Sequence, residues 1–227
     1  MNNNLLTVAV PKGKLLEDVV DLFEKIGFPT EDLKQSTRKL LLEYPEDSLR
    51  YIICRPTDIP TYVEYGASDI GIVGKDTIEE ARKNIFELAD LGFGKCKFVL
   101  ALPEKIIKSS EYEKDFQKIF AGSTHLRVAT KFPNVAREYF DRIGFQAEII
   151  HLHGNIELAP QVGLAEAIID IVSTGRTLKE NNLVAVDDIF EATTRLVANR
   201  VSYRLKHKRI QNLLENIYKH YLEVKND

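Results

Sequence analysis

Residues 167–178 read Ala-Ile-Ile-Asp-Ile-Val-Ser-Thr-Gly-Arg-Thr-Leu, an apolar strand that runs directly into hydroxyl side chains around a glycine. A helix start follows the glycine at once. This strand–loop–helix order is typical of parallel α/β sheets with buried strands. Open α/β sheets bind ligands beyond the carboxyl ends of their strands, so this loop is the first candidate site.

The loop has the features of a phosphate-binding site. Gly175 allows close backbone approach, Ser173, Thr174 and Thr177 add hydroxyl donors, and Arg176 adds charge. Consecutive N–H groups and a helix N-terminus favour an anion. The spacing of a Walker A loop is absent, which disfavours nucleotide hydrolysis by that route. Taken alone, the same residues are equally well explained as a capped strand-to-helix turn.

Strand-like and helical segments alternate along nearly the whole chain. The predicted strands are 6–10, 40–44, 49–55, 69–74, 97–102, 126–130, 147–152 and 167–172. The predicted helices are 15–26, 77–83, 111–120, 134–143 and 203–224. A Pro-Glu-Asp-Ser turn at 45–48 predicts that the strands on either side are antiparallel, so the α/β fold should contain mixed sheets.

Two glycines in the Leu-Gly-Phe-Gly-Lys-Cys stretch at 91–96 mark a place for the chain to cross between two lobes. Residues 1–91 plus 179–227 are predicted to form the first lobe. Residues 92–178 are predicted to form the second, which carries the phosphate loop. Strand-like stretches in 183–196 would return the chain to the first lobe.

Composition limits the class of protein. The chain has 227 residues and a net charge of -3, without the excess of basic residues typical of a nucleic-acid binder. No run approaches the ~20 apolar residues of a membrane span, and the N-terminus lacks the pattern of an export signal. Cys54 and Cys96 form no CxxC pair, which fits a reducing compartment. We expect a cytoplasmic protein with neither nucleic acid nor membrane as partner.

Residues 157–178 as a whole resemble the signature of the ATP phosphoribosyltransferases, which open histidine biosynthesis. Lys14 stands where many members have arginine, and Glu166 where aspartate is usual. Further matching motifs are Pro11-Lys-Gly-Lys-Leu15, Arg55 with Asp58-Ile-Pro60, Tyr65 to Asp76, Asp90 to Cys96 and Arg127 to Asn134.

The resemblance implies a two-lobed fold like that of type II periplasmic binding proteins, with a central cleft. It implies condensation of ATP with 5-phosphoribosyl 1-pyrophosphate to N1-(5-phosphoribosyl)-ATP and pyrophosphate, the feedback-regulated first step of the pathway, with Mg²⁺. The chain ends after the 203–224 helix and so resembles the short form, which works with a regulatory subunit similar to histidyl-tRNA synthetase. A homodimer within a hetero-oligomer is expected.

The same resemblance, with the local pattern, nominates site residues. Candidates for the pyrophosphate are Lys12, Arg55 and Arg38. Candidates for phosphoribosyl pyrophosphate are Glu157, Asp170, Ser173, Thr174, Gly175, Arg176 and Thr177. Candidates for the nucleotide are Gly13, Lys14, Gly74, Asp76 and Lys131. The metal ligands are unknown.

Structural alternatives stay open for several of these residues. Arg55 can form a surface ion pair with Asp58, and Asp76 can be a helix N-cap. Glu157 can be favoured by a helix dipole alone. His151 and His153 share one side of a strand, but without a third ligand we interpret them as structural.

Two rival functions are compatible with the pattern. A small-ligand binding module of the same fold would perform no chemistry, since fold does not fix function. A phosphoribosyltransferase acting on another base would share the phosphate loop, because that loop does not itself select adenine.

Overall fold

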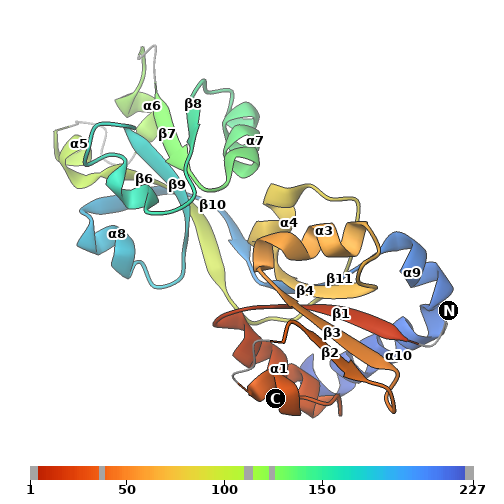
Figure 1. Cartoon of the computed structure of the whole chain (residues 1–227). Helices are drawn as coiled ribbons and strands as arrows, with labels where there is room; N and C mark the ends of the chain where they lie inside the picture. The colour runs from red at the N-terminus through yellow and green to blue at the C-terminus, as the bar shows by residue number, and fades with distance from the viewer. Residues whose placement is uncertain (1–4, 36–38, 110–114, 123–125, 223–227) are drawn as a thin grey trace. The chain divides into compact units, whose positions relative to one another are not determined.

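The computed structural model describes residues 5–35, 39–109, 115–122 and 126–222, which form two compact units (Figure 1). The first unit comprises Met1–Gly94 and Thr193–Asp227, and the second comprises Lys95–Ala192. None of the helices in the described ranges is long and apolar enough to cross a membrane.

The first unit is built on a mixed six-stranded sheet in the order β2-β3-β1-β4-β11-β5. Its strands are β1 (Leu6–Pro11), β2 (Leu41–Tyr44), β3 (Leu49–Cys54), β4 (Ile70–Gly74), β5 (Phe86–Asp90) and β11 (Thr194–Ala198). β1 pairs in parallel with β3 and β4, whereas β2 is antiparallel to β3 across the turn at 45–48. The predicted mixed sheet is therefore confirmed.

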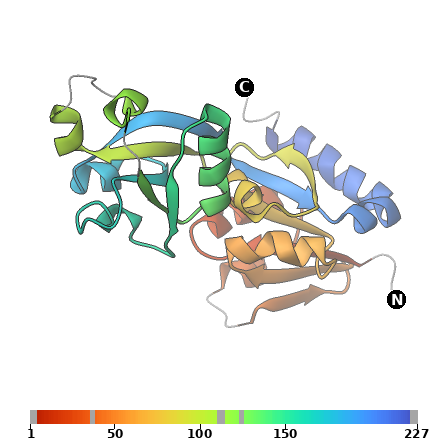
Figure 2. The same ribbon diagram turned by 90° about the horizontal axis from the view of Figure 1, so that it is seen from above.

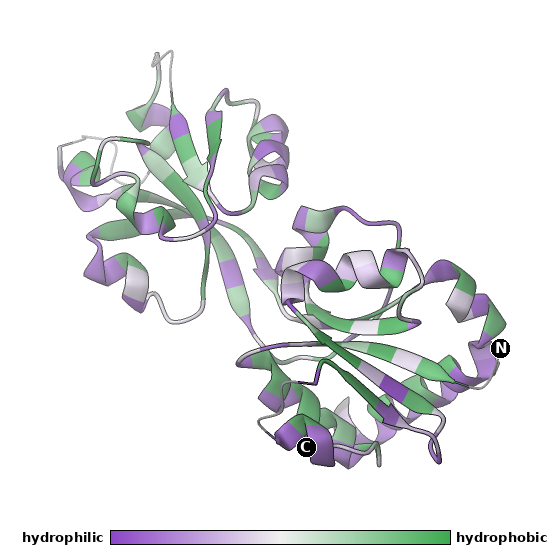
Figure 3. Ribbon diagram, viewed as in Figure 1, coloured by the Kyte–Doolittle hydropathy of each residue, from purple (hydrophilic) through white to green (hydrophobic). Residues whose placement is uncertain are grey.

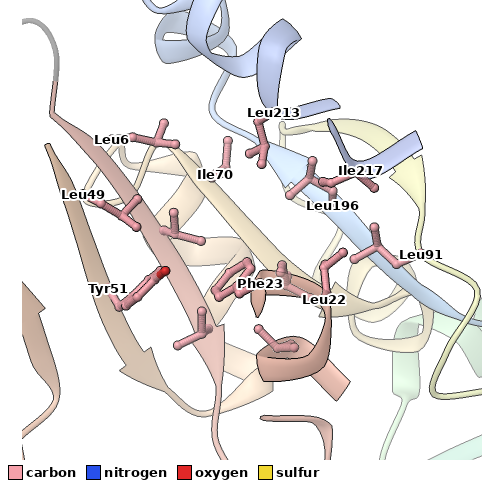
Figure 4. Close-up of a cluster of buried hydrophobic side chains, with 14 of the residues drawn as sticks. Leu6, Leu22, Phe23, Leu49, Tyr51, Ile70, Leu91, Leu196, Leu213 and Ile217 are labelled. Carbon is pink, nitrogen blue, oxygen red and sulfur yellow. The ribbon is translucent and has the colours of Figure 1, made fainter. Parts of the chain in front are cut away.

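Helices cover both faces of this sheet. They are α1 (Leu15–Lys25), α2 (Glu31–Lys34), α3 (Ile59–Glu64), α4 (Lys75–Ala81), α9 (Arg200–Leu205) and α10 (His207–Ile217), with a 3-10 turn at Pro56–Asp58 and a π-helical turn at Tyr218–Leu222. Strand β1 alternates, so Val8 and Val10 pack with α1 and α10 while Ala9 packs with α3. Figures 1 and 2 show α3 and α10 on opposite faces, and Figure 4 shows the larger core between the sheet, α1 and α10.

The second unit contains a five-stranded sheet in the order β10-β6-β9-β7-β8. Its strands are β6 (Cys96–Pro103), β7 (Arg127–Thr130), β8 (Glu148–His151), β9 (Ala167–Val172) and β10 (Leu183–Ala192). Its helices are α5 (Glu104–Lys108), α6 (Phe116–Ile119), α7 (Pro133–Ile143) and α8 (Arg176–Glu180), with a 3-10 turn at Ile156–Leu158. Helix α7 buries Val135, Ala136, Tyr139 and Phe140 while its other face is polar (Figure 3).

The structure differs from the expected lobe boundaries. Residues 179–192 belong to the second unit, and the chain returns to the first unit at Thr193. The physical reason is that β10 pairs with β6 along its whole length, from Leu183 opposite Pro103 to Ala192 opposite Cys96. This long-range pairing leaves no local signal in the sequence.

Two predicted helices also differ from the structure. The single helix expected over 203–224 is divided at Lys206, which separates α9 from α10. Helix α6 is confined to Phe116–Ile119 of the 111–120 segment, of which residues 111–114 lie outside the described ranges. The amphipathic face of α10 is nevertheless as predicted, since Ile210, Leu213, Leu214 and Ile217 are buried.

Candidate functional site

In the first unit, the candidate residues meet at the carboxyl edge of the parallel strands. Pro11 pairs with Cys54, which places Lys12 beside Arg55, and the Lys12 N–H donates to the Cys54 carbonyl at 2.9 Å. Ala9 pairs with Gly71, so β4 ends at the same edge. Parallel registry, rather than any side-chain contact, therefore brings these candidates together.

The cations at this edge are exposed and available. Within the described ranges, the side chains of Lys12, Lys14 and Arg55 form neither ion pairs nor hydrogen bonds. The alternative that Arg55 pairs with Asp58 is therefore wrong. An anion arriving here would meet positive charge that no carboxylate already neutralises. Arg38, the third candidate cation, lies outside the described residues.

The turn after β4 has a second distinct geometry. Gly74 is the N-cap of α4, and Asp76 lies in the first helical turn without capping it, so the prediction that Asp76 caps the helix is wrong. The Asp76 carboxylate folds back over Gly74, where an added Cβ would lie 2.0 Å from its Oδ1 atom. A larger residue at this position would therefore require the Asp76 carboxylate to move.

A neighbouring acidic residue has a purely structural position. Asp69 precedes β4 at the opposite edge of the sheet and is buried. Its Oδ2 accepts the Thr7 N–H at 2.8 Å and lies 2.6 Å from Lys206 Nζ. Asp69 thus fastens the C-terminal helices to the start of β1.

In the second unit, the hydroxyl-rich loop follows β9 as predicted. Gly175 is the N-cap of α8 with φ 74°, a left-handed conformation that other residues rarely adopt. The side chains of Ser173, Thr174 and Thr177 are exposed, and only a long 3.5 Å contact joins Thr174 Oγ1 to the Arg176 N–H. The loop therefore presents hydroxyl groups to solvent rather than using them internally.

Arg176 is held on its own helix. Its Nε lies 2.7 Å from Glu180 Oε1, and 82% of its side chain is exposed. Exposed i,i+4 pairs contribute little stability, so a phosphate can displace Glu180 at small cost.

A charged group lies beside this loop. Thr130 pairs with Ile169, which sets Lys131 next to Asp170 across the parallel strands. Burial raises the pKa of the Asp170 carboxyl, the nearby Glu157 raises it further, and Lys131 acts in the opposite direction. Glu157 reaches this edge from the 3-10 turn at Ile156–Leu158. The structure thus brings Glu157, Asp170 and Lys131 together with the loop.

The histidine pair lies without a third candidate metal ligand among the described residues. The rings of His151 and His153 lie 4.7 Å apart at the end of β8. Across the described part of the chain, no group of three or more His, Cys, Asp or Glu side chains is placed to hold a metal ion.

Sequence reasoning missed a charged cluster at the edge of the first sheet. Lys75 contacts Glu79 and Glu87, and Arg195 contacts Glu87 and Asp90. Lys75 and Asp90 lie within stretches already noted in the sequence, but the pattern does not show that β11 brings Arg195 between their strands.

The sequence matches a known family. The model of the ATP phosphoribosyltransferase family matches residues 55–219. A curated protein named ATP phosphoribosyltransferase from Moorella thermoacetica is 55% identical over 95% of this chain and 92% of its own length. The protein of that name from Desulfitobacterium hafniense is 54% identical over 96% of each chain.

Solved structures agree with this assignment. The ATP phosphoribosyl transferase (HisG:HisZ) complex from Thermotoga maritima contains a chain with TM-score 0.78 and 34% identity, covering 96% of this chain and 100% of that one. The aliphatic sulphonate binding protein SsuA of Escherichia coli, with TM-score 0.59 and 13% identity over 98% of this chain and 74% of that one, shares the fold alone. The two-lobed architecture typical of periplasmic binding proteins is thereby confirmed. The chain belongs to the ATP phosphoribosyltransferase family.

Proposed function

We propose that this chain is the catalytic subunit of a short-form ATP phosphoribosyltransferase. It transfers the phosphoribosyl group of 5-phosphoribosyl 1-pyrophosphate to N1 of the adenine of ATP and releases pyrophosphate, the first step of histidine biosynthesis. The observation that carries the proposal is the exposed hydroxyl loop at 173–177 beside Asp170 and Glu157, in a chain that matches the family over most of its length.

The loop is proposed to hold the 5-phosphate. Because Gly175 has no side chain, the phosphate can approach the backbone N–H groups, and the hydroxyl groups of Ser173, Thr174 and Thr177 donate hydrogen bonds to it. The Arg176 side chain leaves its ion pair with Glu180 and binds the phosphate instead. This arrangement fixes one end of the ribose. It thereby fixes where C1 lies, which is the positioning part of catalysis.

The two carboxylates are proposed to bind the ribose hydroxyl groups. Asp170 is partly buried beside Glu157, and burial raises the pKa of its carboxyl although the Ile171 N–H donates to Oδ1 at 2.8 Å, so further donors would stabilise its ionised form. Ribose hydroxyls supply such donors. The negative charge of both groups also favours the positive charge that grows on the ribose as the bond to pyrophosphate breaks.

The cations of the first unit are proposed to bind the leaving pyrophosphate. Lys12 and Arg55 lie side by side at the carboxyl edge, and Arg38 is proposed to join them. Negative charge grows on pyrophosphate in the transition state, so these cations would bind that state more tightly than the substrate. Gly13, Lys14, Gly74, Asp76 and Lys131 are proposed nucleotide contacts.

Mg²⁺ is proposed to enter as the magnesium complex of the pyrophosphate substrate. The ion usually keeps several waters and binds through substrate phosphates with one or two carboxylates. When bound, it supplies further positive charge to the leaving group.

The regulatory partner is proposed from a similar solved structure, and the cellular compartment from the cysteines. The Thermotoga maritima structure is of a HisG:HisZ complex, so we propose that this chain forms a homodimer within a hetero-oligomer with a regulatory subunit similar to histidyl-tRNA synthetase. Feedback by histidine would act through that subunit. The absence of a CxxC pair from the sequence supports the proposal of a cytoplasmic location.

The test mixes the purified chain with ATP, 5-phosphoribosyl 1-pyrophosphate and Mg²⁺, with and without the regulatory subunit. Products are identified by mass spectrometry while released pyrophosphate is assayed. Thr177→Ala should raise the KM for 5-phosphoribosyl 1-pyrophosphate by about 10-fold or more, the cost of one hydrogen bond to a charged group.

Lys108→Ala is the control in the same unit, because Lys108 is exposed, lies outside the 173–177 loop and pairs only weakly with Glu104 on its own helix. It should leave both KM values unchanged. Substrate binding without product in either preparation would favour the non-catalytic binding module. Product from another base but not from ATP would favour the second rival.

A further inference from the structure

We propose that Asp90 is a positioning residue for this reaction, because its carboxylate ties together the two segments through which the chain passes between its units. These segments are Leu91–Gly94, on the way out of the first unit, and Thr193–Thr194, on the way back. We name them the connecting ribbon. The inference rests on the proposed function but concerns a residue outside the proposed substrate contacts.

The carboxylate of Asp90 has partners on both sides of the connecting ribbon. Its Oδ1 accepts the Gly92 N–H at 2.9 Å and the Thr193 hydroxyl at 2.7 Å. Its Oδ2 lies 2.8 Å from Nη1 of Arg195 on β11. One side chain at the end of β5 therefore joins the outgoing segment, the returning segment and the sheet.

The two segments are also paired through their backbones. The Leu91 N–H donates to the Thr194 carbonyl, and the Thr194 N–H donates to the Phe93 carbonyl, both at 2.9 Å. The pairing continues the antiparallel ladder between β5 and β11. The connecting ribbon is thus rooted in the first sheet, and Asp90 is the side chain that braces it.

A chain of charges links this brace to the proposed nucleotide turn. The backbone N–H of Lys75 donates to the Thr193 carbonyl at 2.9 Å, and Lys75 Nζ lies 2.6 Å from Glu87. Glu87 in turn contacts Arg195, whose side chain is only 20% exposed. Such partly buried networks hold their members in fixed positions. The turn at Gly74–Asp76 and the root of the ribbon therefore share one framework.

This framework predicts the effect of removing the Asp90 carboxylate. The proposed nucleotide contacts belong mainly to the first unit, and the proposed ribose and phosphate contacts belong to the second. The connecting ribbon is the covalent path between them. Loosening its root leaves each set of contacts intact but frees the path of the chain that connects them, so we expect kcat to fall more than KM rises.

The test uses the chain together with its regulatory subunit. Asp90→Ala removes every contact of the carboxylate, Thr193→Val removes one hydroxyl, and Thr193→Ser keeps that hydroxyl. Glu43→Gln is the matched control, because Glu43 forms an exposed ion pair with Arg50 in the same unit. Amide hydrogen exchange at Leu91 and Thr194 is measured beside kcat and both KM values.

In Asp90→Ala we expect exchange at Leu91 and Thr194 to speed up by about 10-fold, the factor for a lost hydrogen bond to a charged group. We expect kcat to fall between about 10-fold and 100-fold while each KM changes less than about 3-fold. Thr193→Val should show both effects in smaller degree, and Thr193→Ser and Glu43→Gln should resemble the original chain.

Unchanged exchange would overturn the proposal, as would faster exchange with unchanged kcat, which would leave Asp90 a merely structural role. If Asp90→Ala does not fold, the contrast between Thr193→Val and Thr193→Ser decides in the same way. Failure of the original complex to form any product, with exchange still faster in Asp90→Ala, would refute the proposed function and not the brace.

Discussion

The carboxyl edges of the two sheets differ in how their polar groups are satisfied. At the first edge, ion pairs link Lys75, Glu87, Asp90 and Arg195, whereas the side chains of Lys12 and Arg55 form no ion pair with any residue that the structure describes. At the second edge, the 173–177 loop keeps its hydroxyl groups in solvent, and Asp170 has a raised pKa beside Glu157.

The difference teaches how a binding protein divides structural and functional charge. Groups that bind one another stabilise the fold, and separating them costs free energy. Groups left without partners, or held against their preferred ionisation, are available for a ligand. By this criterion the second edge is suited to the proposed binding of ribose and phosphate, and the first edge combines a linked set of ion pairs with two cations, Lys12 and Arg55, that pair with none of the described residues.

The largest effect is expected from replacing Asp170, the carboxyl with a raised pKa at the second edge. Asp170→Asn should lower kcat/KM for 5-phosphoribosyl 1-pyrophosphate by about 100-fold, since a hydrogen-bonded carboxylate is lost where positive charge develops. Steady-state kinetics at saturating ATP measure it. Asp141→Asn on the exposed face of α7 is the control. Equal kinetics for both variants would remove Asp170 from the site.

A somewhat smaller effect is expected at the first edge. Arg55→Ala should lower kcat by about 10-fold, and Arg55→Lys should recover only part of it, because lysine cannot bind pyrophosphate oxygens in two-pronged fashion. Arg50→Ala is the control on the same strand, since Arg50 is already paired with Glu43. Full recovery by lysine would show that charge alone matters.

The pH dependence of kcat/KM tests the role of Asp170 at the second edge. The proposed ribose binding by Asp170 requires the ionised carboxylate, so kcat/KM should rise as pH rises through its raised pKa. Glu157→Gln removes a negative neighbour that raises this pKa, so the acidic limb of the pH profile should move to lower pH. An unmoved limb in Glu157→Gln would show that another group controls it.

The same raised pKa has a consequence for stability. A carboxyl whose pKa is higher in the folded state than in the unfolded state costs stability when the pH is high enough to ionise it. Asp170→Asn should therefore have a Tm at neutral pH no lower than that of the original chain, although it is nearly inactive. A clear fall in Tm would mean that Asp170 supports the fold.

The smallest effect is expected away from both carboxyl edges. Arg127 binds the Glu166 carboxylate with Nη2 at 2.6 Å and lowers the pKa of that carboxyl. The stability from this pair is present above the ordinary pKa of glutamate, about 4.3, and is lost as pH falls through the lowered value.

Glu166→Gln should therefore lower the Tm slightly at neutral pH, because the pair is partly exposed. The difference from the original chain should vanish in acid. Activity should hardly change. A large loss of activity would show that the pair positions the 157–166 segment.

Local patterns predicted much of the fold. The stripe at 15–26 and the run at 167–172 gave α1 and β9 nearly to the residue, because their apolar periodicity is complete within the segment. The assignment of residues 179–192 to the second unit was not predictable, since β10 belongs to the second sheet only through its long-range pairing with β6.

The candidate site shows the same division. The Ser-Thr-Gly-Arg-Thr loop is contiguous, so its chemistry is visible in the order of residues. The ionic cluster of Lys75, Glu87, Asp90 and Arg195 is assembled from strands and a helix far apart in the chain. The spacing of these residues along the sequence therefore does not indicate that they meet.

The sequence by itself therefore determined the alternation of strands and helices, the family and the hydroxyl-rich loop at 173–177, because each depends on neighbours along the chain. Only the tertiary structure decided which strands share a sheet. That choice set Lys12 beside Arg55, placed Lys131 next to Asp170, and put the Asp90 carboxylate across both arms of the connecting ribbon. Those outcomes depend on strand registry and desolvation, which are properties of the folded chain alone.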